Sequence, residues 1–590
     1  MNQNEFYILN NLYNASVGRA QVTSDLTLSR AVKDQSAYRG LVERGWIDAS
    51  TGEITDRGLQ SLEPYRVDNA VILAAGSATR FIPLSLEQPK GLYEVKGEKL
   101  IERQIQQLQE AGIRDITVVL GYKQEMFFFL REKYGVKYIF NPLYNVKNNI
   151  ESLLLARQEL KNSYVCACDS YFVENPFNRY EYRSFYAGYS TEKQEDEMYV
   201  RIDMQGRIVC MKEALAGGLM LLGHSFWTRE FSQRFVSLAE EDREIGKYDN
   251  DFWEWMVKDR LTELPPIYFK EYASGCIHEF DTFEQLREFD TDYIGHTRSE
   301  IIRNIKLVFR CDEDDIVDFR TVKEGLTNTS FIFRIDGEDY IYRHPGDGTE
   351  RIINRRNEKQ SLIIAKQFGI DPTYIYMDIN EGWKISRLVK DFREPAYESF
   401  DDSKRIIALL RRLHKIPVKV DYGLRPWEDA LTIERLLKDK EPGCFAKYEA
   451  LKRMVEKLYQ KTINDGVERC FCHGDTYKPN WMLKDDGTVI LIDWEYSGYT
   501  DPGVDIGYYI VDAGYEIDEA KRFIREYLQD SWSERREFHF LAYTAIIAYY
   551  WFVWALYRES CGAVIGESLE HWRSMAERVS GKLTAEGGGE

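Results

Sequence analysis

The sequence predicts a multidomain protein that combines the α/β and α+β fold classes. Its 590 residues exceed what one hydrophobic core supports, and about 150 residues per domain gives three or four units. From residue 69 strands and helices alternate, which indicates a mostly parallel sheet. After about residue 296 paired strands come first and long helices follow, which indicates a separate α+β unit.

These changes in texture set the expected boundaries. We predict a helical domain over residues 1–66, an α/β domain over 67–296 and an α+β domain over 297–590. Neither boundary carries a linker rich in Pro or Ser, so the domains are expected to pack directly on one another.

The composition is that of an acidic globular protein. Hydrophobic residues make up 44% of the chain, and 78 Lys and Arg stand against 97 Asp and Glu, for a net charge of −19. This balance argues against a surface that holds nucleic-acid phosphates non-specifically, although it leaves room for a small basic patch. Nucleic-acid binding is therefore not expected.

The cysteines and the N-terminus suggest a location. Two C-x-C pairs, Cys166/Cys168 and Cys470/Cys472, lie in apolar strand-like runs. Alternate strand residues share a face, so we interpret both pairs as core packing and not as zinc or disulfide pairs. The start of the chain lacks a signal-peptide pattern, and we find no run of ~18 apolar residues that could span a bilayer. A cytoplasmic protein without membrane insertion is expected.

Residues 1–66 are helical and punctuated by turns. A helix that ends at Gly45, a two-strand ribbon and a helix that opens at Thr55-Asp56 resemble a winged helix-turn-helix domain. Such domains often bind DNA, but this segment carries seven basic and eight acidic residues. The charge count favours a packing or dimerisation role, with DNA binding as the alternative.

The α/β domain contains a candidate nucleotide site. Strands are predicted over residues 70–76, 116–120 and 136–140, and their carboxyl ends should form the site. Small residues let backbone N–H groups approach a triphosphate, and cations neutralise it. Arg80 and Lys90 are the candidate cations. The candidate residues of the phosphate turn are Leu73, Ala75, Gly76 and Ser77.

This pattern resembles the sugar-nucleotide type of nucleotidyltransferase, which has a Rossmann-like fold. The segments Asn148–Leu153 and Ile277–Thr282 look like the CTP:phosphocholine cytidylyltransferase branch of that family. The resemblance implies CTP and phosphocholine as substrates, with Asp169 and Asp281 as Mg²⁺ ligands. A helix cap or a turn is the alternative role for both aspartates. A phosphate monoester is already ionised, so its attack on the α-phosphorus needs no general base.

The chain departs from that branch at two positions. Ala78 replaces the second glycine expected in the phosphate turn, and Met198 stands where choline-type enzymes carry a Trp after a Glu. An aromatic face is the usual partner of a quaternary ammonium and contributes about 0.5–2 kcal/mol, so Met198 leaves the identity of the amine open. The candidates around the amine are Glu197 and four aromatic residues that could equally belong to the core: Tyr189, Tyr199, Trp253 and Trp255.

The third domain carries the motif His473-Gly474-Asp475-Thr476-Tyr477-Lys478-Pro479-Asn480, followed by Ile492-Asp493-Trp494-Glu495. An Asp, an Asn five residues on and a second Asp after an apolar strand are what magnesium-dependent phosphoryl transfer to an alcohol needs. Asp475 can accept the hydroxyl proton, while Asn480 and Asp493 can supply oxygen ligands to Mg²⁺. In the alternative, Asp475 and Asn480 only cap a turn, but their order and spacing favour catalysis.

Upstream residues form a candidate ATP site. Gly325-Leu326-Thr327-Asn328 precedes two paired strands and can fold over phosphates, so Asn328 is a candidate nucleotide-binding residue. Arg343 is the candidate phosphate cation, and Glu358 on the next helix is its candidate partner. This is the kinase arrangement of strand cation and helix carboxylate, with Arg in place of the usual Lys. It predicts a bilobal, protein-kinase-like domain.

Residues from about 297 to 590 resemble the choline kinase branch of the aminoglycoside phosphotransferase-like family. Trp551 and Trp554, three apart on a helix, can wall a cationic head group, and Glu495 or Asp505 could add negative charge. Core packing is the alternative for the Trp pair. The segments that carry the resemblance are Gly346–Thr349 with Asn354-Arg355, Ile492–Gly498 with Asp501 and Asp505, and Trp551–Trp554.

Together the resemblances predict a bifunctional enzyme. A kinase that makes phosphocholine from choline and ATP yields the nucleophile that a CTP-dependent cytidylyltransferase converts to CDP-choline and pyrophosphate, with Mg²⁺ as cofactor. Three alternatives stay open. The amine could be ethanolamine or another small amino alcohol. The enzyme-like domains could sense ligands in a DNA-binding regulator. A sugar-1-phosphate nucleotidyltransferase could be joined to an antibiotic kinase, although Asn148-Asn149 and the Trp pair speak against it. An oligomer is possible.

Overall fold

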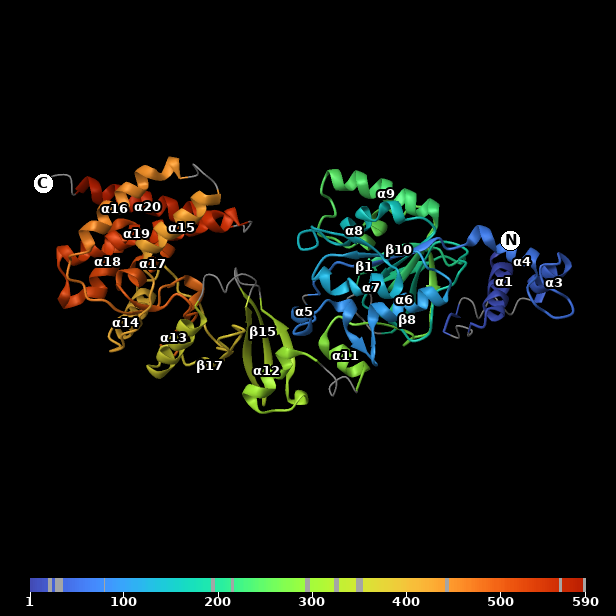
Figure 1. Cartoon of the computed structure of the whole chain (residues 1–590), viewed down its shortest axis with the longest axis horizontal. Coiled ribbons are helices and arrows are strands. Elements are labelled where there is room, and N and C mark those ends of the chain that lie inside the picture. The colour runs from blue at the N-terminus through green and yellow to red at the C-terminus, as the bar shows by residue number, and fades with distance from the viewer. Residues whose placement is uncertain are drawn as a thin grey trace. The chain divides into compact units, whose positions relative to one another are not determined.

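The computed structural model covers the whole chain, which forms two compact units, Met1–Thr321 and Val322–Glu590 (Figure 1). The predicted boundaries at residues 66 and 296 stay predictions. The structure describes every residue outside the following segments: 20–23, 27–34, 79, 193–196, 214–216, 292–297, 323–327, 346–353, 441–444, 562–564 and 587–590.

Unit 1 begins with the helices α1 (Gln3–Ser16), α3 (Gln35–Glu43) and α4 (Asp56–Leu62). A single antiparallel bridge between Ile47 and Ile54 lies before α4, and Thr55 caps that helix. The apolar faces of these helices share one core cluster with Tyr180 of the following domain. The winged-helix assignment stays a prediction.

A nine-stranded sheet forms the centre of unit 1, with the strand order β10-β9-β11-β6-β1-β4-β5, with β8 paired to β11 and with β12 paired to β8. The strands β6, β1, β4 and β5 are parallel, as predicted. The strands β8 to β11 are antiparallel instead, because short connections cannot hold a crossover helix. The bounds are β1 (Asn69–Ala74), β4 (Ile116–Leu120), β5 (Lys137–Phe140), β6 (Ser163–Ala167), β8 (Phe185–Thr191), β9 (Met198–Ile202), β10 (Ile208–Glu213), β11 (Gly218–Trp227) and β12 (Tyr268–Glu271).

Helices cover both faces of this sheet. Ile72 of β1 points into one core with Ile105 of α6, whereas its neighbour Val71 points into the other core with Leu153 of α8 and Phe231 of α9. This alternation is what a strand buried on both faces requires. The helices are α5 (Leu84–Glu87), α6 (Leu100–Glu110), α7 (Phe129–Tyr134), α8 (Asn149–Leu155), α9 (Arg229–Glu244), α10 (Trp253–Asp259), α11 (Phe283–Phe289) and α12 (Glu300–Phe309).

Short strands complete unit 1. β7 (Ser170–Phe172) pairs with β13 (Ile277–Glu279), and β2 (Glu94–Val95) pairs with β3 (Glu98–Lys99). β14 (Val317–Thr321) is the last element of the unit. The β7–β13 pair matters for the site, because it joins the segment after β6 to a segment more than a hundred residues later.

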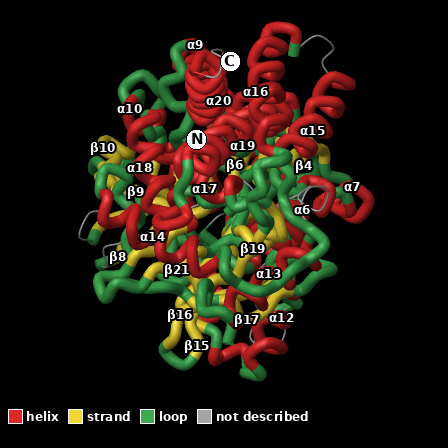
Figure 2. Tube along the Cα trace, turned by 90° about the vertical axis from the view of Figure 1, so that its left-hand side faces the viewer, coloured by secondary structure: helices red, strands yellow, loops and turns green. Residues whose placement is uncertain are grey.

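Unit 2 starts with strands that pair in the order β15-β16-β18-β17, all antiparallel. Figure 2 shows β15, β16 and β17 grouped together. The helix α13 (Arg355–Gln367) packs against β17. The strand bounds are β15 (Asn328–Ile335), β16 (Glu338–Pro345), β17 (Tyr374–Met377) and β18 (Lys384–Arg387).

The rest of unit 2 is helical and contains two antiparallel strand pairs, β19–β22 and the hairpin β20–β21. The bounds are α14 (Phe400–Leu413), α15 (Pro426–Lys440), α16 (Glu449–Thr462), β19 (Cys470–Cys472), β20 (Trp481–Leu483), β21 (Val489–Leu491), β22 (Gly498–Thr500), α17 (Gly503–Ala513), α18 (Ile517–Leu528), α19 (Glu534–Ser560) and α20 (Glu567–Glu586).

Helix α19 runs through the middle of these helices (Figure 1) and contacts α15, α16, α17, α18 and α20. By length and composition it could cross a membrane, contrary to the expectation that no such segment exists, but 89% of its apolar stretch is buried inside the protein. Its apolar character is explained by its place in the core.

Candidate active sites

The first centre lies where parallel strands end side by side. Leu73 of β1 pairs with Ala167 of β6, and the N–H of Cys168 donates to the Leu73 carbonyl oxygen at 3.1 Å. The segments after the two strands, which begin with Ala75 and Asp169, therefore emerge next to each other. The predicted phosphate turn and the predicted metal ligand share one edge of the sheet.

Lys90 connects the two predicted metal aspartates. Its Nζ lies 2.7 Å from Asp169 Oδ2 and 3.7 Å from Asp281 Oδ1. The β7–β13 pair aligns Glu279 with Ser170, which brings Asp281 close to Asp169. Asp281 is not a helix cap, because Thr282 caps α11 through Gln285 N. We call Lys90, Asp169, Glu279 and Asp281 the Lys90 centre.

The carboxylates of the Lys90 centre determine the protonation state of the lysine. Burial opposes the charged form of Lys90, but Asp169, Glu279 and Asp281 outweigh it and raise the pKa of the lysine. Burial raises the pKa of Glu279 well above its usual range, and the negative charge of Asp169 acts in the same direction. A lysine that stays charged at any physiological pH can neutralise an incoming phosphate.

The predicted phosphate turn is open on one side. Gly76 is exposed, and a Cβ added to it would meet no atom within 4 Å. Arg80 is also exposed, while Ser77 and Leu73 are half-buried and Ala75 is buried. Ala78 has a φ of 50°, a left-handed conformation that glycine adopts at lower cost. The backbone thus keeps the shape expected of the glycine that Ala78 replaces.

Several of the residues predicted to surround the amine are buried in the core. Trp253 stacks on Tyr186 with ring centroids 5.2 Å apart, and Met198 lies in the same buried cluster. Tyr199 is fully buried as well. Tyr189, Glu197 and Trp255 are half-buried, and contact of any of these residues with substrate stays a prediction.

The second centre is built around the loop after β19. The side-chain amide of Asn480 donates to Asp475 O at 2.9 Å and to Asp475 Oδ2 at 3.1 Å. Gly474 has a φ of 87°, and a Cβ there would lie 2.4 Å from Tyr496 O. Only glycine fits this turn. Burial, and next the charge of Asp493, raise the pKa of Asp475 to about 7.

Arg343 ties the strands of unit 2 to this loop. Its guanidinium donates to Glu358 Oε1 at 2.5 Å and to Asp493 Oδ1 at 3.1 Å. Lys384 lies opposite Arg343 in the β16–β18 register, 3.4 Å from Glu358 and 3.7 Å from Asp493. Arg355 contacts Glu358 at 3.0 Å. The Asp475 centre comprises Arg343, Arg355, Glu358, Lys384, Asp475, Asn480, Asp493 and Glu495.

The charges of this network keep one carboxylate ionised. Burial opposes the ionised form of Glu358, but Arg343, Lys384 and Arg355 outweigh it and lower its pKa to about 2. Glu495 behaves in the opposite way, because burial and the charge of Asp493 raise its pKa. Its Oε2 lies 3.6 Å from an Arg343 nitrogen.

Asp505 accepts hydrogen bonds from the backbone of the loop that carries Asp475. It is fully buried and accepts hydrogen bonds from His473 N at 2.9 Å and Gly474 N at 2.7 Å. His414 Nε2 lies 2.9 Å from the same carboxylate. This packing gives Asp505 a positioning role, and the predicted contact with substrate stays a prediction.

The predicted Trp pair adjoins the Asp475 centre. Trp551 stacks on Tyr508 with centroids 5.0 Å apart, and the Tyr508 side chain hydrogen-bonds Asp475. Trp554 contacts Trp551 edge to face. Both Trp residues are buried, and their indole nitrogens have no hydrogen-bond partner among the described residues. The backbone of Asn328 lies in β15, but its side chain and the segments 323–327 and 346–353 are outside the described residues.

Comparisons with known proteins agree with the two centres. The family of the MobA-like NTP transferase domain matches residues 70–220, and the phosphotransferase enzyme family matches residues 318–538. The choline-phosphate cytidylyltransferase of Streptococcus pneumoniae is 36% identical over 221 residues, which are 38% of this chain and 96% of that protein. This chain belongs to the MobA-like NTP transferase family.

Two further proteins are similar to one part each. The 2-aminoethylphosphonate cytidylyltransferase of Lancefieldella rimae is 30% identical to 39% of this chain and is covered over 95% of its length. The structure of choline kinase LicA from Streptococcus pneumoniae is 24% identical to 49% of this chain, with 100% of that chain covered and a TM-score of 0.42. The two family matches and the cytidylyltransferase relatives show that the chain joins a nucleotidyltransferase domain to a phosphotransferase, kinase-like domain, as predicted.

The sequence analysis did not identify several residues that lie in or beside the two centres. In the nucleotidyltransferase domain, Tyr186 donates to Glu254 Oε1 at 2.7 Å and interacts electrostatically with Glu279 and Glu197. Burial raises the pKa of Glu254 to about 7. In the kinase-like domain the missed residue is Lys384. The short strand Lys384–Arg387 has no sequence pattern that marks Lys384, and only the strand register places Lys384 opposite Arg343.

Both centres fit a divalent cation. Asp169 Oδ1 is buried and has no hydrogen-bond partner among the described residues. In the kinase-like domain, ligand oxygens of Glu358, Asp493 and Glu495 lie within 4.8 Å of one another. Carboxylate oxygens are the ligands that Mg²⁺ prefers. Asn480 donates through its amide nitrogen, so its amide oxygen remains as a ligand atom.

Proposed function

We propose that the chain phosphorylates choline with ATP and then couples the phosphocholine to CTP, giving CDP-choline and pyrophosphate. The observation that carries the proposal is the presence of both centres in one chain. Asp475 with Asn480 and Asp493 suits transfer to an alcohol, and Lys90 between Asp169 and Asp281 suits transfer to a phosphate. The product of the first reaction is the nucleophile of the second.

In the kinase step, Asp475 would take the proton of the choline hydroxyl while the hydroxyl oxygen attacks the γ-phosphorus and ADP leaves. Arg343 and Lys384 would hold the phosphates, with Glu358 fixing both cations. Asn480 and Asp493 would hold Mg²⁺, which, when bound, neutralises charge on the triphosphate.

In the transferase step, an oxygen of phosphocholine would attack the α-phosphorus of CTP, and pyrophosphate would leave with the electron pair of the broken bond. Lys90, placed by Asp169, would neutralise the charge that develops at the α-phosphate. The exposed turn at Gly76 would bind the other phosphates through backbone N–H groups. Asp169 and Asp281 would hold the Mg²⁺ of this domain.

The choice of a cationic substrate rests on charge and aromatic surface. Burial raises the pKa of Glu254 and Glu279 near Tyr186, and a cation bound beside them would favour their ionised forms. Trp551 lies beside Asp475 through Tyr508. Both features attract an ammonium group. The second candidate is a primary amine such as ethanolamine, which Met198 favours because it removes one aromatic face.

The test supplies choline, ATP, CTP and Mg²⁺ to the full chain and follows both products by mass spectrometry. We expect Asp475→Asn to stop phosphocholine formation while leaving conversion of added phosphocholine intact, and Asp169→Asn to do the reverse. A chelator should stop both steps. Competition between choline and ethanolamine decides the amine. If either variant retained its assigned step at the wild-type rate, that site would be wrongly assigned.

We also propose that residues 1–66 serve packing and not DNA recognition. Asn14 hydrogen-bonds Asn178 at 3.0 Å, and Asp25 lies 3.5 Å from the buried Lys270, so the segment is anchored to the transferase domain. A DNA-binding regulator would instead show sequence-specific duplex binding that weakens steeply with salt. Electrophoretic mobility shifts with random and genomic fragments would reveal it.

A further inference from the structure

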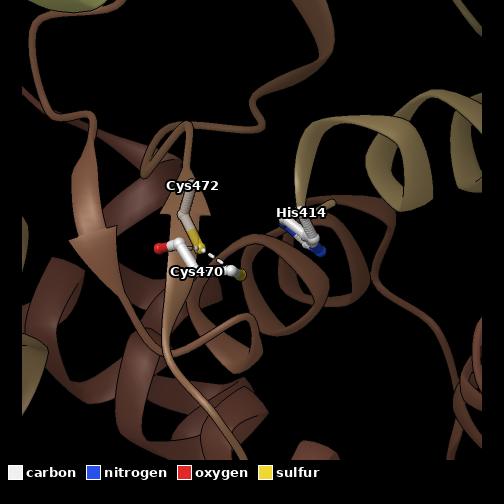
Figure 3. Close-up of side chains that lie close together, drawn as sticks. All are labelled: His414, Cys470 and Cys472. Carbon is white, nitrogen blue, oxygen red and sulfur yellow. Dashed lines mark hydrogen bonds between the residues drawn. The ribbon is translucent and has the colours of Figure 1, made fainter. Parts of the chain in front are cut away.

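The kinase-like domain contains a cluster of soft ligands outside its active centre. Cys470 and Cys472 lie on β19, and His414 follows the end of α14. Figure 3 shows the imidazole across from the two sulfur atoms. The two Sγ atoms are 3.5 Å apart, and ligand atoms of all three residues lie within 4.8 Å of one another.

We propose that His414, Cys470 and Cys472 form a binding site for a soft divalent metal ion of the Zn²⁺ type. Zn–S and Zn–N bonds of about 2.3 and 2.0 Å place tetrahedral ligands roughly 3.5–3.8 Å apart, so the observed spacing needs only small side-chain shifts. Two thiolates and an imidazole are ligands that Zn²⁺ prefers over Mg²⁺. The proposal adds a role to Cys470 and Cys472, which the sequence analysis interprets as core packing.

The surroundings resemble the support that a metal site needs. His414 Nε2 lies 2.9 Å from Asp505 Oδ2. Nδ1 lies 2.7 Å from Tyr527 OH, so a metal ion bound through Nδ1 must displace the Tyr527 hydroxyl. A carboxylate on one ring nitrogen orients a ligating imidazole.

The other C-x-C pair provides an internal contrast. Cys166 and Cys168 have the same spacing at the end of β6, but among the described residues they belong to no group of three metal-ligating side chains. The same sequence pattern therefore predicts metal binding only at β19.

The site is tested on reduced, metal-free full-length protein with Co²⁺ as the probe, in excess Mg²⁺ to occupy the oxygen sites. We expect thiolate-to-Co²⁺ charge-transfer absorption in the near ultraviolet, abolished by one equivalent of Zn²⁺ per chain. Cys470→Ser should weaken Zn²⁺ binding on the order of 100-fold, and Cys166→Ala should leave it unchanged.

Circular dichroism and the kinase rate check that each variant is folded, and Cys472→Ala serves as a second variant if Cys470→Ser is not. Wild-type protein without the charge-transfer band, or a folded Cys470→Ser protein that binds Zn²⁺ as tightly as the wild type, would overturn the proposal. So would a chain whose two thiols form a disulfide and bind no ion after reduction.

Discussion

The Lys90 centre places one lysine between two aspartates, whereas the Asp475 centre spreads its carboxylates over Arg343, Lys384 and Arg355. The difference follows the chemistry proposed for each. Attack by an ionised phosphate requires charge neutralisation and no base, so one well-placed cation carries the burden. Attack by a hydroxyl requires a base as well, and Asp475 can remain a base only where neighbouring carboxylates are separately neutralised.

The comparison implies that replacing Lys90 lowers the rate of its reaction more than replacing one of the cations around Glu358 lowers the rate of the other. Lys90→Gln should lower the transferase rate by about 10²–10³-fold and leave the kinase rate unchanged, as measured with added phosphocholine and with choline separately. Lys133→Gln is the matched control, because Lys133 pairs with Glu102 on the surface. A transferase that loses less than tenfold would show that Arg80 or Mg²⁺ suffices.

The Asp475 centre should lose less activity when one of its cations is replaced. Lys384→Met is expected to lower kinase kcat/KM for ATP roughly tenfold, because Arg343 and Arg355 still hold Glu358. Lys359→Met, which removes a lysine bonded to the Met377 carbonyl oxygen at 2.9 Å, should have little effect. Initial rates over a range of ATP concentrations separate the two. A loss as large as that of Lys90→Gln in its own reaction would end the distinction between the centres.

Sequence analysis identified site residues at the ends of strands more successfully than site residues whose role depends on contacts between distant segments. Asp169, Asp281, Asp475 and Asp493 each follow an apolar run, and the pattern of such a run is local. Lys384 and Glu254 were missed because their partners are set by strand register and by helix packing, which depend on residues far along the chain. Asp505 was a predicted site residue, but its contact with His414 was missed for the same reason, because the two residues lie on distant segments.

A smaller effect is expected at the buried carboxyl beside Tyr186. The raised pKa of Glu254 means that the folded protein holds a proton between its ordinary value and about 7, so unfolding releases a proton and stability falls as pH rises through that window. Glu254→Gln should remove this loss and stabilise the transferase domain by on the order of 1 kcal/mol above about pH 7, with little change near pH 5.

Thermal unfolding of the full chain at the two pH values measures this difference. The exposed Glu230→Gln is the control. Equal melting temperatures for Glu254→Gln and wild type at the higher pH would contradict a raised pKa of Glu254.

The smallest expected effect comes from residues with a left-handed backbone, which differ between the two domains. Asp493 has a φ of 70° and Ala78 a φ of 50°, but Asp tolerates the left-handed region better than Ala. Ala78→Gly should therefore stabilise the transferase domain by up to about 1 kcal/mol, whereas Ala239→Gly in helix α9 should destabilise it by a similar amount. Denaturant midpoints decide the sign, and a destabilised Ala78→Gly protein would mean that the turn carries no strain.

The core that residues 1–66 share with Tyr180 has a practical consequence for anyone who dissects this chain. A fragment cut at residue 67 would leave Tyr180 and its neighbour Tyr182 facing water where Phe6 and Tyr13 now cover them. It would also strip Lys270 of Asp25, one of its two buried counter-ions. Such a fragment would tend to aggregate, so expression of the transferase half alone should start at the first helix.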